Sequence, residues 1–256
     1  MLIIRAEQMK VFEQASRRRF EDEMVEHAKA FAPPLCEVIG DEALRVAIRS
    51  AIVRAENYGF TNRGPIRLFI EFMFLCGSAF DTDPQYRAVG QFLRGSGDQM
   101  YRAQQIHEWH NVYLEQVSGP GAVNVHRALS ETLAFARLPL TITPENLTEG
   151  LLLEMKRIFP SKAAFVGDAG LTAVIDESMA EARLYRFEGV RPKVLLAVLK
   201  FAFGHGCTED PLYPWIRQTL RDERIAGPEA RAARLEKKSI TWLEHVVARN
   251  QKGSQS

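Results

Sequence analysis

The apolar residues of this chain recur with the spacing of helices rather than of strands. Between residues 44 and 55 they follow the i, i+3, i+4, i+7, i+8, i+11 pattern of one helix face, at Leu44, Ala47, Ile48, Ala51, Ile52 and Ala55. No segment alternates convincingly between apolar and polar residues, and no Asn-Gly or Asp-Gly pair marks a hairpin. We therefore predict an all-α protein. Its helices are expected near residues 5–31, 42–58, 65–76, 84–94, 98–117, 123–136, 144–159, 169–186, 191–203, 211–223 and 228–249.

The pattern also repeats within the chain. When the sequence is shifted by 127 residues, Asp83-Pro84 coincides with Asp210-Pro211 without any gap. The shift gives at least 13 identities over the 47 positions from 40 to 86, where unrelated sequences would give roughly 3. Other coinciding pairs are Gly40 and Gly167, Leu44 and Leu171, Tyr58 and Tyr185, Phe60 and Phe187, Gly77 and Gly204, and Tyr86 and Tyr213. These identities predict an internal duplication of a multi-helix unit.

The repeat divides the chain into five segments. We assign copy one to residues 1–95, connecting helices to 96–140, copy two to 141–220, a C-terminal helix to 221–250 and a disordered tail to 251–256. Two copies are too few for an open solenoid, which needs three or more to bury a continuous core. We therefore expect the copies to pack together, with approximate two-fold symmetry.

Eight of the repeated residues are predicted to cap helices. An aspartate after a glycine can accept the first free amides of the next helix, and a glycine can end a helix in a left-handed conformation. An aspartate before a proline is typical of a new helix, because the missing N–H of the proline is not needed in the first turn. The four pairs are Asp41 and Asp168, Gly77 and Gly204, Asp83 and Asp210, and Pro84 and Pro211.

Composition narrows the classes of partner. The chain is 46% hydrophobic and 25% charged, which is typical of a soluble globular protein. Its net charge is +1, and the basic triplet at 17–19 is followed at once by three acidic residues at 21–23. We expect neither a nucleic-acid nor a membrane partner, because such binding usually needs a basic excess on one face. No window has the length or apolar character of a signal peptide core or a membrane span.

The cysteines point to a cytoplasmic protein. Cys36, Cys76 and Cys207 are odd in number, far apart and set in apolar sequence. They are expected to be reduced core residues, not a disulfide framework or a zinc site.

The loop Asp81-Thr82-Asp83 could bind a metal ion, since Asp-x-Asp recurs in calcium-binding loops. Such loops need further oxygen ligands at fixed spacing, whereas here the chain runs straight into Pro84. The matching residue of Asp81 in the second copy is Thr208, which carries no carboxylate. A structural role for this loop is therefore favoured, with Asp81 still able to bind a polar group of a partner.

Two histidine motifs suggest other chemistry. His205 and Cys207 invite a cysteine–histidine nucleophile, but the signatures around catalytic cysteines are missing. His107 and His110 could ligate zinc from one helix face, yet no third ligand is marked. We therefore predict no catalytic residue, no metal site and no cofactor. The contrasting alternative is a small-ligand or metal-binding enzyme with Asp81, Asp83, His205 and Cys207 around a cleft between the copies.

The last predicted helix is polar at its start and apolar at its end, where it carries Ile240, Trp242, Leu243, Val246 and Val247. It could pack on the second copy, which is favoured, or present an apolar face to a partner. Our candidate contacts for a protein partner are Phe80, Asp81, Tyr86, His205, Trp215 and Trp242.

Three stretches resemble a known group of proteins. "IRAEQMKVF", "AENYGF" and "FMFLCGSAFDTDP" are similar to the opening hundred residues of uncharacterised helical proteins of Gram-negative bacteria. Those proteins are encoded beside type VI secretion effectors, VgrG spike proteins, PAAR tips and adaptor chaperones. The resemblance covers about residues 1–90. In that group the Asp-Pro pair often continues into Pro-Trp, whereas here only the second copy has this pair, at Pro214-Trp215.

The resemblance implies a role in effector delivery. It suggests a non-enzymatic accessory protein, a co-chaperone or adaptor, that binds an effector or its adaptor chaperone before loading. The implied partner is a secretion effector, an adaptor chaperone or a PAAR or VgrG component. An immunity protein that neutralises a co-encoded toxin is a second role in the same setting.

Overall fold

The computed structural model describes residues 6–253, and no strand occurs among them. The all-α prediction is therefore confirmed. The helices are α1 (Ala6–Phe31), α2 (Pro33–Ile39), α3 (Asp41–Asn57), α4 (Arg63–Cys76), α5 (Arg87–Arg94), α6 (Gln99–Tyr113), α7 (Val123–Arg137), α8 (Leu147–Ile158), α9 (Pro160–Leu184), α10 (Val190–Phe203), α11 (Pro214–Leu220) and α12 (Pro228–Gly253). Short turns η1 (Pro84–Tyr86), η2 (Leu114–Ser118) and η3 (Pro120–Ala122) join some of them.

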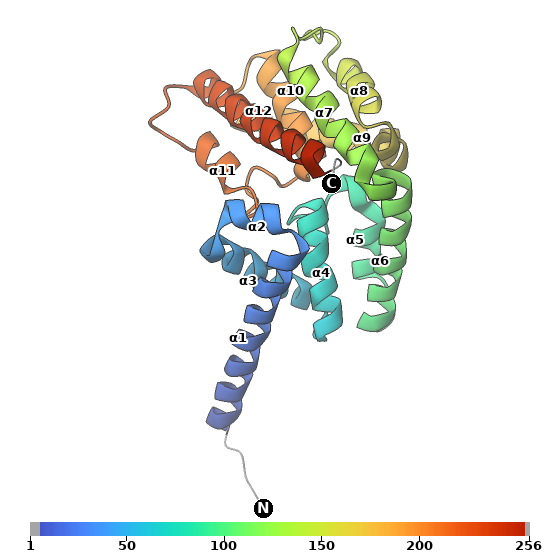
Figure 1. Ribbon diagram of the computed structural model, residues 1–256, viewed down its shortest axis with the longest axis vertical. Coiled ribbons are helices and arrows are strands. Elements are labelled where there is room, and N and C mark those ends of the chain that lie inside the picture. The colour runs from blue at the N-terminus through green and yellow to red at the C-terminus, as the bar shows by residue number, and fades with distance from the viewer. Residues whose placement is uncertain (1–5, 254–256) are drawn as a thin grey trace, which may run out of the picture.

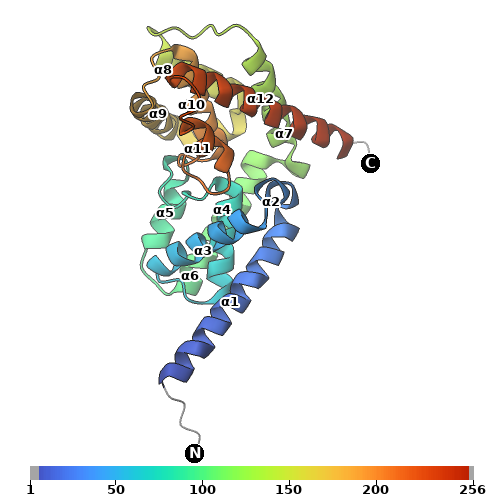
Figure 2. The same cartoon turned by 90° about the vertical axis from the view of Figure 1, so that its left-hand side faces the viewer.

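The helices gather in two groups, one above the other. Helices α2 to α6 form the lower group, and α7 to α12 form the upper group (Figure 1). The N-terminal part of α1 extends away from both groups, as Figures 1 and 2 show. The C-terminal end of α12 extends beyond α7 on the opposite side of the molecule (Figure 2). Among the described residues, no helix is both long and apolar enough to cross a lipid bilayer.

Helices α4 and α10 lie at the centre because they have almost no polar face. Their buried residues include Phe69 and Phe72 in α4 and Leu196 and Phe201 in α10. The larger core cluster joins α1, α3, α4 and α6 to the C-terminal end of α10 and to α11 and α12. A smaller cluster lies among α8, α9 and α10. The cores of the two groups therefore meet where α4 and α10 end.

Several helices differ from the prediction. Helix α9 begins at Pro160, not near residue 169, and α12 runs to Gly253 into the predicted tail 251–256, whose last three residues lie outside the described part of the chain. Helix α2 was not expected, because Pro33-Pro34 interrupts the apolar pattern, yet a proline fits the first turn of a helix. The predicted helix 98–117 is α6, which passes into a π-helical turn after Tyr113. The predicted helix 211–223 begins only at Pro214, so Pro211 lies in a turn.

The capping residues also need correction. The N-cap of α3 is Gly40, whereas Asp41 lies inside the helix and pairs with Lys29. Gly167 and Asp168 lie within α9, which is kinked at Gly167, and Asp168 pairs with Lys156. An acidic side chain in the first turn of a helix still interacts favourably with the positive end of the helix dipole, although it accepts no capping hydrogen bond.

Several backbone conformations recur at the spacing of 127 residues. Gly40 has φ 76° and ψ 162°, and Gly167 has φ 72° and ψ 163°. Gly77 has φ 90° and ψ 154°, and Gly204 has φ 94° and ψ 153°. These ψ angles place Gly77 and Gly204 outside the left-handed helical region that a usual C-cap adopts. Only glycine enters the region that they occupy without a large steric cost.

Candidate functional site

Helices α4 and α10 end against each other at Gly77 and Gly204. A Cβ atom on Gly204 would lie 2.5 Å from the carbonyl oxygen of Cys76, and one on Gly77 would overlap the carbonyl oxygen of Phe203. Either approach is closer than real side chains allow, so glycine is required on both sides for reasons of space as well as of conformation.

The two Asp-Pro corners hold each other by reciprocal hydrogen bonds. The backbone N–H of Ser78 donates to Oδ2 of Asp210 at 2.7 Å, and the backbone N–H of His205 donates to Oδ2 of Asp83 at 2.7 Å. The other oxygen of each carboxylate accepts from the backbone N–H two residues further on, at Gln85 and Leu212. Each aspartate therefore caps its own turn and fixes the opposite corner.

Both aspartates are buried. Burial raises the pKa of Asp83 and of Asp210, although the backbone N–H groups that donate to them act in the opposite direction. Each carboxylate accepts from two main-chain N–H groups, and Asp83 also accepts from the side-chain amide of Gln85 at 3.2 Å. Asp83 and Asp210 therefore stabilise the two corners and the turns that follow them.

Asp81 is also occupied within the protein. Its carboxylate forms an ion pair with Arg54 and accepts from the hydroxyl of Tyr58 at 2.8 Å. Arg54 in turn donates to the backbone oxygen of Ser78 at 2.6 Å. An isolated buried carboxylate would be strongly unfavourable, and this pairing satisfies it.

Different residues do the equivalent work in the second corner. Lys200 pairs with Glu181 at 2.6 Å and donates to the backbone oxygen of His205 at 2.8 Å. Glu181 also accepts from the hydroxyl of Thr208, the residue that matches Asp81. The acid is thus on α9 in one corner and in the loop in the other, and each corner keeps a buried pair of opposite charges.

The other predicted candidates near the corners lie inside the molecule. Phe80 and Tyr86 are buried, and so is Cys207, whose thiol pKa is raised by burial. His205 is half-buried and contacts Glu177 at 3.0 Å through Nδ1 and Thr82 at 3.1 Å through Nε2. The structure therefore brings His205 to the Asp83 corner. Phe80 and Asp81 are almost fully covered, whereas Tyr86 is buried but lies in the wall of a groove.

His107 and His110 lie in different environments. His107 is exposed, whereas His110 packs edge-on against Phe72 at a centroid distance of 5.1 Å. Burial lowers the pKa of His110. Within residues 6–253, no group of three or more His, Cys, Asp or Glu side chains is placed to hold a metal ion.

A groove of about 1340 Å³ lies where the two helix groups face each other. Its walls come from α2, the end of α4, η2, α7, the start of α9, the end of α10 and α12. Four of its apolar side chains are exposed by 39–63%: Val38, Leu75, Leu114 and Val125. The predicted contact residues Trp215 and Trp242 line this groove and are half-buried.

The charged residues of the groove are all basic. None of the described residues that line it is Asp or Glu. The basic side chains that line it are Arg127, Lys162, Arg234, Lys237, Lys238 and Arg249. In a chain of net charge +1, six cations without a carboxylate mark a local concentration of positive charge.

Helix α12 supplies most of that charge. Arg234, Lys237, Lys238, Thr241, His245 and Arg249 recur at helical spacing and face the groove. A different face of α12 carries Ala232, Leu235 and Leu243, which are buried. One of the basic side chains has an acidic partner: Oε2 of Glu37 lies 3.8 Å from Arg249.

The charged side chain of Lys162 lies in the groove beside two aromatic rings. Its ammonium group donates to the backbone oxygen of Phe201 and lies 4.5 Å from the ring centroid of Phe201 and 5.7 Å from that of Tyr86. Burial lowers the pKa of Lys162 to about 8. A lysine ammonium has three N–H donors, and the described residues accept from only one of them.

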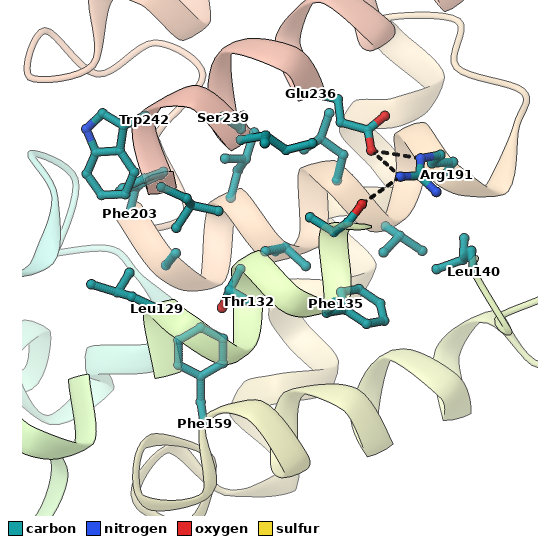
Figure 3. A pocket seen from close by; sticks show the side chains of 18 residues that line it. Leu129, Thr132, Phe135, Leu140, Phe159, Arg191, Phe203, Glu236, Ser239 and Trp242 are labelled. Carbon is teal, nitrogen blue, oxygen red and sulfur yellow. Dashed lines mark hydrogen bonds and ion pairs between the residues drawn. The ribbon is translucent and has the colours of Figure 1, made fainter. Parts of the chain in front are cut away.

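A smaller apolar chamber opens beside the groove, between α7, α10 and α12 (Figure 3). Its volume is about 70 Å³, and it shares Leu129, Phe159, Ala202, Phe203 and Trp242 with the groove. Figure 3 shows Phe203 and Trp242 at one end and the paired side chains of Arg191 and Glu236 at the other. Among the described residues that line the chamber, the charged ones are Arg191 and Glu236, which pair with each other, so the chamber is an apolar recess without net charge.

The sequence pointed to the two tryptophans of the groove but missed its basic side. The signal was present in Arg234, Lys237, Lys238 and Arg249, which share a helix with no acid on the same stripe. Comparison with known proteins gives no matching family model, no matching curated protein and no matching solved structure.

Proposed function

We propose that this protein is a non-enzymatic accessory protein that binds a segment of a partner protein in the groove. The observation that carries this proposal is the group of exposed apolar side chains, with Val38 at 63% and Leu75 at 44%, inside a hollow of about 1340 Å³. Large exposed apolar patches usually mark interaction sites, because leaving them in water costs free energy. A hollow bordered by helices suits recognition of a protein segment.

The role that fits such a groove is the one implied by the resemblance. In the cytoplasm, the protein would hold a type VI secretion effector, its adaptor chaperone or a PAAR or VgrG component before delivery. An immunity protein would use the same groove to cover a toxin, and the two roles differ in which neighbour is bound and in what binding does to a toxin's activity.

The proposal includes an internal duplication. Support comes from the identities at a spacing of 127 residues, the matching φ and ψ of Gly77 and Gly204, and the reciprocal bonds of Asp83 and Asp210. In this view the groove combines elements of both copies with the connecting helices, so it could arise only after the copies were joined.

The test is a pull-down with the purified products of the genes beside it. We expect one of the effector, adaptor or spike proteins to bind, and Val125→Arg to abolish binding, because Val125 lies in the groove. Val123→Arg is the matched control, since Val123 is exposed on the same helix and is not among the groove-lining residues. Equal binding by both variants, or no binding of any neighbour, would contradict the proposal. Rescue of cells that express the neighbouring toxin would instead favour immunity.

A further inference from the structure

We infer that the partner segment is an amphipathic helix that carries carboxylates beside an apolar face with an aliphatic anchor residue. This inference rests on the proposed function and adds the chemistry of the partner. It follows from the charge of the groove, from the state of its backbone groups and from the size of the side chamber.

Charge selects an acidic segment. Six basic side chains line the groove, and the described lining residues include no carboxylate. Within residues 6–253, Arg234 and Lys237 form no ion pair, so both are free to pair with a ligand. An acidic segment would gain from these charges and a basic one would be repelled, which determines both the rate and the specificity of association.

Backbone hydrogen bonding selects a helix. The groove is lined by helices and helical turns, whose backbone N–H and C=O groups are largely bonded within each helix. An extended segment would find no strand edge here and would leave its own backbone groups unpaired on an apolar floor. A helix satisfies its backbone internally and can bury an apolar stripe, which is the helix-in-groove mode of recognition.

The side chamber selects an aliphatic anchor. Its volume of about 70 Å³ is about half that of the ~150 Å³ apolar cavity that holds benzene. The end of a valine, leucine or isoleucine side chain fits such a space, whereas an aromatic ring does not. Phe203 and Trp242 line both the chamber and the groove, and their rings lie edge-to-face at a centroid distance of 4.9 Å (Figure 3).

A second copy of this chain is the competing occupant. The extended part of α1 exposes Met9, Val11 and Phe12 and could in principle enter the groove of another molecule. Residues 6–19 of this helix carry four basic and two acidic side chains, a net charge of +2 that the basic groove would repel. We therefore assign the groove to an acidic partner, and self-association is an outcome that the test can detect.

The probe is a tryptophan-free peptide of about 18 residues, long enough to form a helix alone, with leucines on one face and glutamates on both flanks. Its twin has lysine at every glutamate position. Binding to the full-length protein is followed by the fluorescence of Trp215 and Trp242, which line the groove. We expect the acidic peptide to bind at least about tenfold more tightly than its twin, and less tightly when salt is raised to about 0.5 M.

Variants locate the effect. Arg234→Glu combined with Lys237→Glu should remove the preference for the acidic peptide, and folding should be unchanged because both residues are exposed. Arg231→Glu is the control, because it changes charge on α12 outside the groove lining. Equal binding of both peptides, no fluorescence change with either, or an equal effect of Arg231→Glu would overturn the inference. Dimerisation at the peptide concentrations used, with displacement by neither peptide, would assign the groove to a second copy instead.

The two proposals fail separately. If a neighbouring protein binds in a Val125-dependent manner but the acidic peptide does not, the chemistry inferred for the segment is wrong and the binding function stands. If the acidic peptide binds and no neighbouring protein does, the accessory role is wrong and the groove chemistry stands.

Discussion

Gly77 and Gly204 combine two demands that no other residue meets. Their positive φ angles, 90° and 94°, disfavour any side chain, and the end of the opposite helix fills the space where a Cβ atom would lie. Gly167 has the first demand without the second, because nothing lies within 4 Å of its Cβ position. Comparing substitutions at Gly77 and Gly167 therefore separates two contributions to the free energy of unfolding: backbone strain, and steric overlap with the neighbouring helix.

Gly77→Ala should destabilise the protein far more than Gly167→Ala. Conformational strain alone should cost Gly167→Ala about 1–3 kcal/mol in the free energy of unfolding. Gly77→Ala should lose about 2 kcal/mol or more beyond that, because α4 and α10 must move apart. Urea unfolding of the two variants measures the difference. Equal losses would mean that the helix ends are not in close contact.

Because of Lys162, the free energy of unfolding should change with pH in the alkaline range. Its pKa falls from 10.5 in the unfolded chain to about 8 in the folded protein, so below pH 8 folding must bury a charge. Between pH 8 and 10.5 the unfolded chain holds the proton that the folded protein has released, so this lysine's destabilising effect fades as pH rises.

Lys162→Met should therefore stabilise the protein at pH 7. The buried charge costs roughly 3 kcal/mol, and losing the hydrogen bond to Phe201 returns about 1–2 kcal/mol of that. We expect a net gain of about 1–2 kcal/mol at pH 7 that becomes a net loss of about 1–2 kcal/mol above pH 10.5, where only the missing hydrogen bond counts, measured by urea unfolding of both proteins. A difference that does not change with pH would show that the ammonium group is solvated in the folded state.

Helix α12 has a buried face and an exposed face that lines the groove. Leu235 is fully buried in the core, while Lys237, two residues later, is exposed at the groove. Residues two apart on a helix point in different directions, which lets packing and binding be changed independently.

Leu235→Ala should lower the free energy of unfolding by about 2–5 kcal/mol, as for other buried leucines. Lys237→Ala should change it by no more than about 0.5 kcal/mol but weaken binding of the acidic peptide. Thermal unfolding and peptide titration of the two variants check both statements. A stability loss in Lys237→Ala would mean that this face also takes part in packing.

The predicted helices agree with the structure where an apolar stripe is long, as in α3, and fail where a segment is short. Pro33-Pro34 removed the pattern that would have indicated α2, which has only seven residues. The N-cap of α3 is Gly40 and not Asp41, because the chain changes direction at the positive φ of the glycine, where α2 ends and α3 begins. Such details depend on how neighbouring helices meet, which a single segment does not encode.

At the scale of the whole molecule, the corners join the two helix groups into one structure. Asp83 accepts from His205 in the other group, Asp210 accepts from Ser78, and the larger core cluster includes both Phe69 and Phe203. The groups should therefore lose their structure together.

We expect a single thermal transition by calorimetry, and Asp83→Ala should lower its midpoint without splitting it. This variant leaves the N–H groups of Gln85 and His205 without an acceptor, which should cost about 2–4 kcal/mol, or on the order of 10 °C. Two separate transitions, in the native protein or in the variant, would show that the groups fold independently.

The groove could not be predicted from the sequence because its residues come from distant segments of the chain. Val38, Val125 and Arg234 are far apart in the chain and share a surface only because α2, α7 and α12 converge. Trp215 is a candidate because it belongs to the Pro-Trp pair of the resemblance, and Trp242 because it lies in the apolar part of the last predicted helix. Phe80 and Tyr86 are aromatic candidates too, and both are core residues. Residue type identifies candidates, and only the packing decides which of them reach the surface.

The reciprocal corner also contains the geometry of a dimer. Ser78 and Asp83 in one half provide the same donor and the same acceptor as His205 and Asp210 in the other. Two copies of the first half alone could therefore close an equivalent corner, each Asp83 accepting from Ser78 of the other copy across a two-fold axis between two glycines. A self-complementary contact of this kind is what a symmetric homodimer requires. Under the duplication that we propose, such a contact would let a single unit pair with a second copy of itself before the two were joined in one chain.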